Sequence, residues 1–420
     1  MTDIARWDWD IGDTAIPIAA WKERFRWVEE PHASPDGQCV AAIVNLDEGQ
    51  FGVCVNGDPW EAQFDKIWHL RFSPDGRLTA LVSEEGEWTL AVDGEPWEER
   101  FGYIWNPLFS ADGRHIAVAA QQDMQYAMAL DGAMWENRFA NMTDFALSTD
   151  GRHTAAAVQV RETGEADMAK FQAGCYSAAL DGVAWNAAFV NVWHPVISPD
   201  GRRLAAEVRQ SLYDYTIAVD GRPWNRSFAG VWEPIFHPAT GAVIAPVRID
   251  GRWTLAADAV PIWEQRFFQA WHQMVAPDGA RLAAVVSPRY GHWTLALDGR
   301  PWTTTVNEMV AEAVFSPDGA RLAAAAKHDG RWSLLVDDRR WQQTADRIWA
   351  PVFSPDGKIL AAKVKTGGRY RLAVNDRLRP ETYDALWPPV FSPGGDRMML
   401  RAIQDGTYHR RILPLDRLLA

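Results

Sequence analysis

Short apolar runs separated by polar turn residues cover almost the whole chain. Residues 348–353 (IWAPVF) and 321–326 (RLAAAA) are typical, and most runs are four to seven residues long and bounded by Gly, Pro or Asp. That is the length of a β-strand rather than of a helix. Where Asp-Gly joins two runs, as at Asp298-Gly299, it supplies the positive φ angles that a tight hairpin needs. The pattern therefore predicts an all-β protein of short antiparallel strands.

A turn built around Ser-Pro-Asp-Gly divides these strands into ten units. Its final glycines are 37 to 40 residues apart, except for one interval of 50 residues. The ten turns span residues 34–37, 73–76, 110–113, 148–151, 198–201, 237–241, 276–279, 316–319, 354–357 and 392–395. Each unit holds four apolar runs, and four antiparallel strands in about 40 residues describe the blade of a β-propeller. The units must stack, because one unit cannot bury its own apolar face.

Aromatic residues keep fixed places within the unit. Tryptophans begin the first strand, an aromatic residue opens the third, and a further column of tryptophans lies in the fourth. The fourth-strand column comprises Trp21, Trp60, Trp97, Trp135, Trp185, Trp224, Trp263, Trp302 and Trp341. The next unit departs from it, with Arg379-Pro380 where a Trp is expected. Because large rings bury about 150–250 Å² each, we expect this column to fill the gaps between adjacent blades. A role in binding or electron transfer is the alternative for the few exposed rings.

The chain starts and stops out of phase with the repeat. Residues 16–25 resemble the fourth-strand segment 260–267, yet no first three strands precede them. Residues 408–415 look like a third strand with no Trp-bearing fourth strand after it. The N-terminal segment, residues 1–25, is therefore expected to complete the last blade and remove the free sheet edges. We predict one ten-bladed ring over residues 1–420; two five-bladed rings are the alternative.

The fourth unit carries the extra length, in a loop at residues 160–175 between its second and third strands. Insertions in repeat proteins map to loops, often on a binding face. Glu162, Glu165, Asp167 and Lys170 are therefore candidates for contact with a partner. An insertion that the fold tolerates at its surface, without a role in binding, explains the loop equally well.

Composition narrows the possible partners and location. The formal net charge of −13 argues against nucleic acid and against docking on anionic lipid headgroups, both of which need basic surfaces. The sequence lacks an apolar run of 18 residues, so no membrane span is expected. Its first ten residues lack the basic start and apolar core of a signal peptide. A cytoplasmic location is the prediction, and the three cysteines are expected to be free thiols.

The sequence does not contain the common motifs for catalysis or cofactor binding. The chain has no Gly-rich phosphate loop, Cys-x-x-Cys pair, zinc-protease motif or Gly-x-Ser-x-Gly elbow. His69, His194 and His272 each follow a first-strand Trp, but neighbouring units carry Asn106, Glu233 and Ala350 at that place. Turn chemistry explains the repeated Asp without calcium. We therefore expect no catalytic residue, no metal and no cofactor.

The run Phe-Ser-Pro-Asp-Gly-Arg/Lys followed by Leu-Ala-Ala resembles the WD40-like propeller repeats of the TolB type over essentially the whole chain. Ten units, 23 Trp residues and this length also resemble the tryptophan-rich cytoplasmic subunit of the Tmc transmembrane electron-transfer complex of sulfate-reducing bacteria. That resemblance implies a subunit without its own cofactor. It also implies partners in a cytochrome c, a membrane cytochrome b and an iron–sulfur protein.

The sequence and these resemblances together suggest a non-catalytic scaffold that docks on the cytoplasmic side of a membrane-associated redox complex, at the periphery of the inner membrane. The alternative is a propeller that binds a small molecule or peptide in its central channel. An enzyme is disfavoured because the sequence offers no nucleophile–base pairing.

Overall fold

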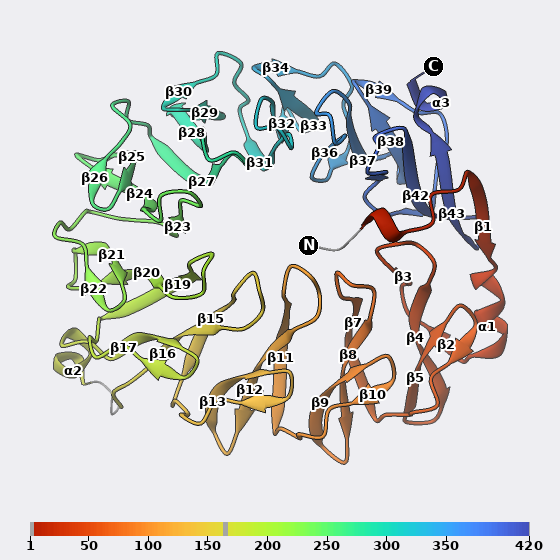
Figure 1. Ribbon diagram of the computed structural model, residues 1–420, viewed down its shortest axis with the longest axis horizontal. Helices are drawn as coiled ribbons and strands as arrows, with labels where there is room; N and C mark the ends of the chain where they lie inside the picture. Colours follow the sequence, from red (N-terminus) through yellow and green to blue (C-terminus); the bar gives the residue numbers. More distant parts are fainter. Residues whose placement is uncertain (1–3, 163–166, 420) are drawn as a thin grey trace. The chain divides into compact units, whose positions relative to one another are not determined.

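The computed structural model describes residues 4–162 and 167–419. Ten antiparallel sheets of four strands follow one another along the chain, so the protein is a ten-bladed β-propeller, as the repeat predicts (Figure 1). In blades 1, 9 and 10 the first strand is interrupted and forms two short pieces. Contacts divide the described chain into two compact units: residues 49–52 and 61–273, and residues 4–48, 53–60 and 274–419. The features argued below each lie within one of these units.

Blade 2 illustrates the repeating sheet. Strands β7 (Lys66–Phe72), β8 (Leu78–Glu84), β9 (Glu87–Val92) and β10 (Glu95–Pro96) pair in sequence order. The fourth strand has only two residues, and a single bridge between Trp88 and Phe101 continues its pairing with the third. The aromatic residue that opens the third strand is therefore also a pairing position.

The other blades repeat this order with the following bounds. Blade 1 has β2 (Trp27–Val28), β3 (His32–Ala33), β4 (Val40–Asp47), β5 (Gln50–Val55) and β6 (Asp58–Pro59); blade 3 has β11 (Tyr103–Phe109), β12 (Ile116–Gln122), β13 (Gln125–Leu130) and β14 (Ala133–Met134); blade 4 has β15 (Met142–Leu147), β16 (Thr154–Gln159), β17 (Tyr176–Leu180) and β18 (Val183–Ala184); blade 5 has β19 (Asn191–Ile197), β20 (Leu204–Arg209), β21 (Tyr215–Val219) and β22 (Arg222–Pro223); blade 6 has β23 (Ile235–Phe236), β24 (Val243–Ile249), β25 (Arg252–Ala257) and β26 (Val260–Pro261).

Blades 7 to 10 complete the series. Blade 7 has β27 (Gln269–Val275), β28 (Leu282–Arg289), β29 (His292–Leu297) and β30 (Arg300–Pro301); blade 8 has β31 (Met309–Phe315), β32 (Leu322–His328), β33 (Arg331–Val336) and β34 (Arg339–Arg340); blade 9 has β35 (Arg347–Ile348), β36 (Val352–Phe353), β37 (Leu360–Thr366), β38 (Arg369–Val374) and β39 (Arg377–Leu378); blade 10 has β40 (Ala385–Leu386), β41 (Val390–Phe391), β42 (Arg397–Gln404), β43 (Thr407–Pro414) and β1 (Gly12–Ile16).

The few helical segments are short. They are the 3₁₀ turns η1 (Ile4–Arg6) and η2 (Ile18–Ala20) and the helices α1 (Trp21–Arg24), α2 (Met168–Gln172) and α3 (Leu415–Leu419). Over the residues that the structure describes, no helix has the length and apolarity needed to cross a membrane.

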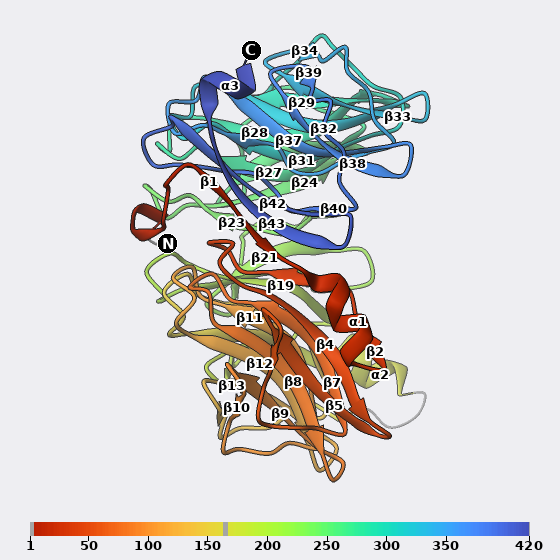
Figure 2. The ribbon, with the colours of Figure 1, turned by 90° about the vertical axis from the view of Figure 1, so that its right-hand side faces the viewer.

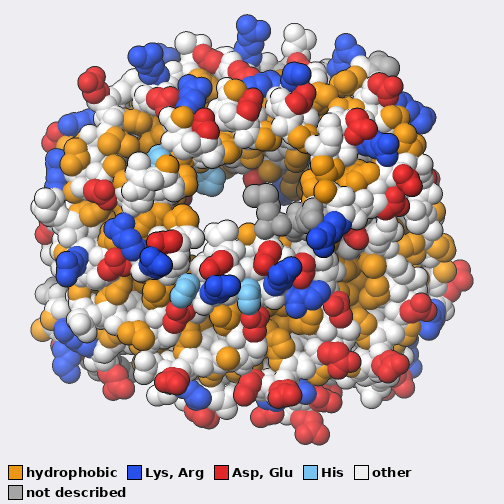
Figure 3. All heavy atoms as spheres, viewed as in Figure 1, with side chains coloured by type: hydrophobic (Ala, Val, Ile, Leu, Met, Phe, Trp, Pro, Cys, Tyr) orange, Lys and Arg blue, Asp and Glu red, His pale blue; other side chains and the backbone are white. Residues whose placement is uncertain are grey.

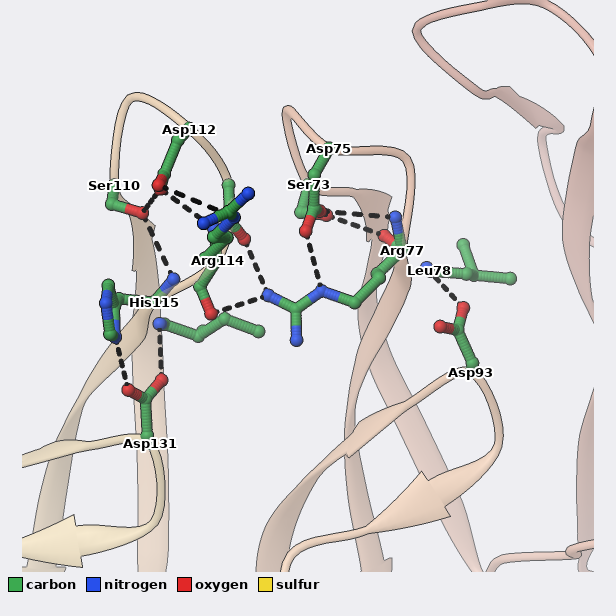
Figure 4. A network of polar contacts seen from close by, with 12 residues as sticks. Ser73, Asp75, Arg77, Leu78, Asp93, Ser110, Asp112, Arg114, His115 and Asp131 are labelled. Atoms are coloured by element: carbon green, nitrogen blue, oxygen red, sulfur yellow. Dashed lines mark hydrogen bonds and ion pairs between the residues drawn. The ribbon is translucent and has the colours of Figure 1, made fainter. Parts of the chain in front are cut away.

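Local hydrogen bonds explain both turn signatures. In blade 3 the Ser110 hydroxyl donates to the Asp112 carboxylate at 2.7 Å, and the same carboxylate accepts the backbone N–H of Arg114 at 3.1 Å (Figure 4). In the Asp-Gly hairpin, Asp131 and Gly132 have φ angles of 48° and 89°, the left-handed pair of a type I′ turn. The Asp131 carboxylate also accepts the N–H of Ile116 at 2.8 Å and so fixes the start of the second strand.

An arginine links neighbouring turns. The Arg77 guanidinium of blade 2 donates to the carbonyl oxygens of Gly113 and Arg114 in blade 3, at 2.6 and 2.8 Å (Figure 4). Arg321 makes the same contact to the Gly357 carbonyl at 3.0 Å. These charged donors satisfy exposed turn carbonyls and fix the spacing of adjacent sheets.

The N-terminal segment completes blade 10. Strand β1 pairs antiparallel with β43, from Gly12 opposite Ile412 to Ile16 opposite Tyr408 (Figure 2). The pairing strand thus precedes most of the 16–25 segment that the repeat comparison matched, and Trp21–Arg24 within that segment forms the helical turn α1. A first ring of five blades would need a closing strand in blade 5. The sheet of blade 5 instead consists only of β19 to β22.

The hydrophobic core lies between neighbouring sheets. Leu81 and Leu90 of blade 2, for example, form one buried cluster with Ile116 and Val118 of blade 3. Within the fourth-strand column, Trp21, Trp135 and Trp263 are buried, and the other six tryptophans are half-buried.

One of these indoles illustrates a contact between blades. The Trp135 Nε1 of blade 3 donates to the Thr154 hydroxyl of blade 4 at 2.8 Å. The same ring lies against the Asp-Gly hairpin of blade 4, where a Cβ atom added to Gly182 would be 3.1 Å from it.

The long loop of blade 4 contains α2. Asp167 caps this helix by accepting the N–H of Lys170 at 3.0 Å, and the two side chains form an ion pair at 3.3 Å. Glu162 and Lys170 are exposed, whereas Glu165 lies outside the described residues. The contact of this loop with a partner stays a prediction.

Candidate functional site

The first strands of blades 2 to 5 share a distortion at one position. His69, Asn106, Asp144 and His194 all have φ angles of 48° to 53°. The pairing register between the first and second strands shifts at these points, for example between Trp105 and Leu108. Left-handed backbone is uncommon for residues other than Gly, and bulges of this kind redirect a side chain. The bulge turns one polar side chain per blade out of the sheet.

Blades 3 to 6 bring four side chains from corresponding first-strand positions to one cleft of about 540 Å³; three of them lie at the bulges, and the fourth, Glu233, does not have the left-handed backbone. The cleft is lined by Asn106, Asp144, His194 and Glu233, together with the apolar residues that follow them in each strand. Two of the four are carboxylates, and His194 and Asn106 complete the row. The carboxylates outnumber the one imidazole, so the cleft is acidic.

His194 also pairs with a carboxylate that is not one of these four residues. Its Nδ1 lies 3.3 Å from Oε2 of Glu207, whose side chain is nearly buried while that of His194 is 46 % exposed. The hydrogen bond to Glu207 raises the pKa of His194, and Asp144 and Glu233 add to the rise, although burial opposes it. Burial raises the pKa of the Glu207 carboxyl. A proton is thus held more tightly at this pair than at either group alone in water.

An aromatic cleft of about 500 Å³ adjoins this pair. Its lining includes Trp193, His194, Glu207, Trp232 and Arg248. In blades 5 and 6 the first-strand Trp stacks on the aromatic residue that opens the third strand. The ring centroids of Trp193 and Tyr215 are 6.5 Å apart, and those of Trp232 and Trp253 are 5.2 Å apart.

Aromatic rings continue across blades 2 to 4. Trp68 lies 6.4 Å from Tyr103, Tyr103 lies 5.8 Å from Trp105, and Trp105 lies 5.8 Å from Phe145. Trp68 is 44 %, Tyr103 39 % and Trp232 40 % exposed, so their faces are available to a partner. Large exposed aromatics in one region mark interaction sites. We call the following set the first-strand surface: Trp68, Tyr103, Asn106, Asp144, Trp193, His194, Glu207, Trp232 and Glu233.

In blade 9 the corresponding aromatic pair contacts a cationic side chain. The Lys363 ammonium lies 4.4 Å from the ring centroid of Trp349 and 4.6 Å from that of Tyr370. Lys363 lies opposite the first-strand Trp, the strand position that Glu207 occupies in blade 5. A cation over an aromatic face is attracted by the ring quadrupole. Blade 5 has the aromatic pair and a carboxylate in place of the lysine.

The chemistry of the first-strand surface therefore suits a cationic group from outside. Its carboxylates and aromatic faces attract ammonium or guanidinium groups, and the aromatic cleft is also lined by Arg248 and His194. Within residues 4–162 and 167–419, no group of three or more His, Cys, Asp or Glu is placed to hold a metal ion. The visible face of the molecule mixes acidic, basic and apolar side chains (Figure 3).

Sequence reasoning had noted part of this site. It singled out His69, His194 and His272 as a column and named Asn106 and Glu233 beside them, but it did not include Asp144 or Glu207. A glutamate in the small apolar strand Leu204–Arg209 was the available signal for Glu207. The nine fourth-strand tryptophans and the loop residues Glu162, Asp167 and Lys170 are not among the residues of the first-strand surface.

Comparisons with known proteins leave the function open. No protein family model matches the sequence, and no curated protein matches it significantly. Among solved structures, the chain is similar to one described as the crystal structure of the eukaryotic initiation factor, with a TM-score of 0.48 and 11 % sequence identity over 90 % of this chain and 97 % of that chain. The function is therefore argued from the first-strand surface itself.

Proposed function

We propose that this protein is a non-catalytic interaction scaffold whose first-strand surface binds Lys or Arg side chains of a partner protein. The observation that carries the proposal is Lys363 on the Trp349–Tyr370 pair of blade 9. Blades 5 and 6 repeat this pair as Trp193–Tyr215 and Trp232–Trp253. Glu233, next to Trp232 in the sequence, adds negative charge there, so a lysine or arginine from outside would meet both a ring face and a carboxylate.

The identity of the partner is the finer part of the proposal. The resemblance to the tryptophan-rich Tmc subunit supports docking on the cytoplasmic side of a membrane-associated electron-transfer complex with cytochrome b, cytochrome c and iron–sulfur subunits. In this role the scaffold carries no cofactor of its own and catalyses no reaction. The propeller contributes a rigid surface that orients the redox subunits.

Zero-length carbodiimide cross-linking tests the docking surface directly, because it joins a carboxylate to a lysine amine only when the two are in contact. The affinity-tagged protein would be purified from its native cells under mild detergent, cross-linked, digested and analysed by mass spectrometry. We expect cross-links from Asp144 or Glu233 to partner lysines. Cross-links confined to carboxylates elsewhere would contradict the assignment of the surface.

A matched pair of variants tests the docking surface separately from the identity of the partner. Trp232→Ala should lose the co-purifying protein, whereas Trp27→Ala, which removes a Trp of similar exposure (49 %) outside the surface, should retain it. If the retained partner is not a membrane redox subunit, the electron-transfer proposal fails while the scaffold proposal stands. Recovery of the protein only as a free monomer would refute both.

A further inference from the structure

The seam between blades 9 and 10 lacks the tryptophan of the fourth-strand column. In blade 8 the Trp341 N–H donates to the Leu334 carbonyl at 2.8 Å, and in blade 9 the Arg379 N–H donates to the Leu372 carbonyl at the same distance. Arg379 therefore occupies the place of the tryptophan in the strand register. A guanidinium stands where an indole packs in the neighbouring blade.

Blade 10 differs at the same seam. The other blades have an Asp-Gly or related hairpin after the third strand, but β43 continues into α3, and the fourth strand is β1 from the other end of the chain. The Arg377 guanidinium donates to the carbonyl of Leu419 in α3 at 3.1 Å. Two departures from the repeat thus meet between the same two sheets.

A cavity of about 380 Å³ lies at this seam, and we call it the seam cavity. Its apolar lining includes Leu372, Leu400, Leu413 and Leu418. Its polar lining consists of Arg379, Arg411, Arg417, Tyr383, Asp13 and Glu381. This volume and this mixture of apolar walls with a few charged groups are typical of a small-molecule site.

The charged groups that line the seam cavity differ in whether they have a hydrogen-bond partner. Asp13 accepts from the Arg411 Nε at 2.8 Å and also contacts the His409 Nδ1 at 2.9 Å. The Nε of Arg379 is shielded from solvent and has no hydrogen-bond partner in the part of the chain that the structure describes. Buried donors without a partner are rare in folded proteins. Arg379 therefore offers an unused, charged donor at a cavity with leucine walls.

We propose that the seam cavity binds a small aromatic carboxylate. Its planar ring would lie between the leucines, in the place that an indole fills at other seams, and its carboxylate would accept hydrogen bonds from Arg379 and Arg417. The guanidinium fork matches a carboxylate in geometry as well as in charge. This site is separate from the first-strand surface and does not depend on partner docking.

Isothermal titration calorimetry of the full chain with indole-3-acetate, phenylacetate, 1-naphthoate and benzoate tests the proposal, with neutral indole and acetate as comparisons. At least one aromatic carboxylate should bind with a dissociation constant below about 1 mM, and indole or acetate alone at least tenfold more weakly. Arg379→Gln should weaken the best ligand by about tenfold or more.

The decisive variant is Arg379→Trp, which restores the residue found at the other seams. It should fold with an unchanged or raised melting temperature and no longer bind the ligand, because its indole occupies the cavity. Arg340→Gln, an exposed arginine beside Trp341, should bind as the wild type does. Absence of binding by all four carboxylates, or binding by Arg379→Trp as tight as by the wild type, would overturn the proposal.

Discussion

The hydroxyl of Tyr408 donates a hydrogen bond of 2.8 Å to the carbonyl oxygen of Gly37, a residue 371 positions away in the sequence. Tyr408 belongs to the last blade and Gly37 to the first turn of the repeat. The Arg410 Nε donates to the neighbouring Asp36 carbonyl, also at 2.8 Å. The contact between the last and the first blade is therefore made by buried polar groups as well as by apolar packing.

Replacement of Tyr408 by Phe should destabilise the protein. The ring is fully buried, so the substitution keeps its packing and leaves the Gly37 carbonyl without this donor, at a cost of about 1–3 kcal/mol. Thermal unfolding followed by circular dichroism should record a lower midpoint. Tyr290→Phe, at a side chain that is 87 % exposed, should leave the midpoint unchanged. Equal midpoints for both variants would contradict a role of this bond in closure.

Gly182→Ala should destabilise the protein more than Gly251→Ala. Both glycines follow an Asp in a hairpin and have φ angles of 79° and 75°, so both substitutions incur the left-handed strain of about 1–2 kcal/mol. Only at Gly182 would the new Cβ also press on Trp135, at 3.1 Å, whereas nothing lies within 4 Å of a Cβ at Gly251. Unfolding midpoints measured side by side should separate the two. If they coincide, the indole does not constrain the hairpin.

The fold could be predicted because its determinants are local. The Ser-Pro-Asp-Gly and Asp-Gly turns are stabilised by side chains a few residues away, such as Ser110 and Asp112. Each unit can therefore be recognised in the sequence by its turn residues. The position of the closing strand was harder to predict. Pro17 has no N–H to pair with β43, so the strand ends at Ile16 and extends upstream instead.

The candidate site depends on contacts that no local pattern contains. Glu207 meets His194 because the register places Glu207 opposite Trp193 across two strands. Asp144 and Glu233 join them only because consecutive blades bring corresponding first-strand segments to one cleft. The column of residues after the first-strand Trp was visible in the sequence, but the bulge that turns these side chains outward was not.

The stability of the protein should fall as pH rises above about 6.5, and His194→Gln should reduce that fall. The pKa of His194 is raised in the fold from a usual value of 6.5, so its contribution is complete below that pH and is lost as pH increases through the raised value. Glu207 changes stability in the same direction, because burial raises its pKa and its ionisation opposes folding. Melting temperatures between pH 5.5 and 8.5 should show the difference. The exposed half of His194 keeps the effect modest.

A control histidine is available for this experiment. His69 occupies the equivalent bulge of blade 2, and in the described residues it has no hydrogen-bonded carboxylate. His69→Gln, which removes an imidazole from the corresponding position, is the matched control for His194→Gln. The same dependence in the wild type and His194→Gln would show that the His194–Glu207 pair is not responsible for it.

Reversal of charge at Glu233 should weaken the partner complex by about tenfold or more and make the remaining binding less sensitive to salt. A lysine there would repel a cationic partner group beside Trp232, and such interactions are screened over about 8 Å at physiological ionic strength. Glu312→Lys is the matched control, because Glu312 lies at the corresponding position of blade 8, four residues before its turn, and follows an alanine rather than a tryptophan. Both variants change the net charge equally. Dissociation constants measured at several salt concentrations should therefore differ between them, and an equal loss in both would attribute docking to overall charge instead of to the aromatic and acidic surface.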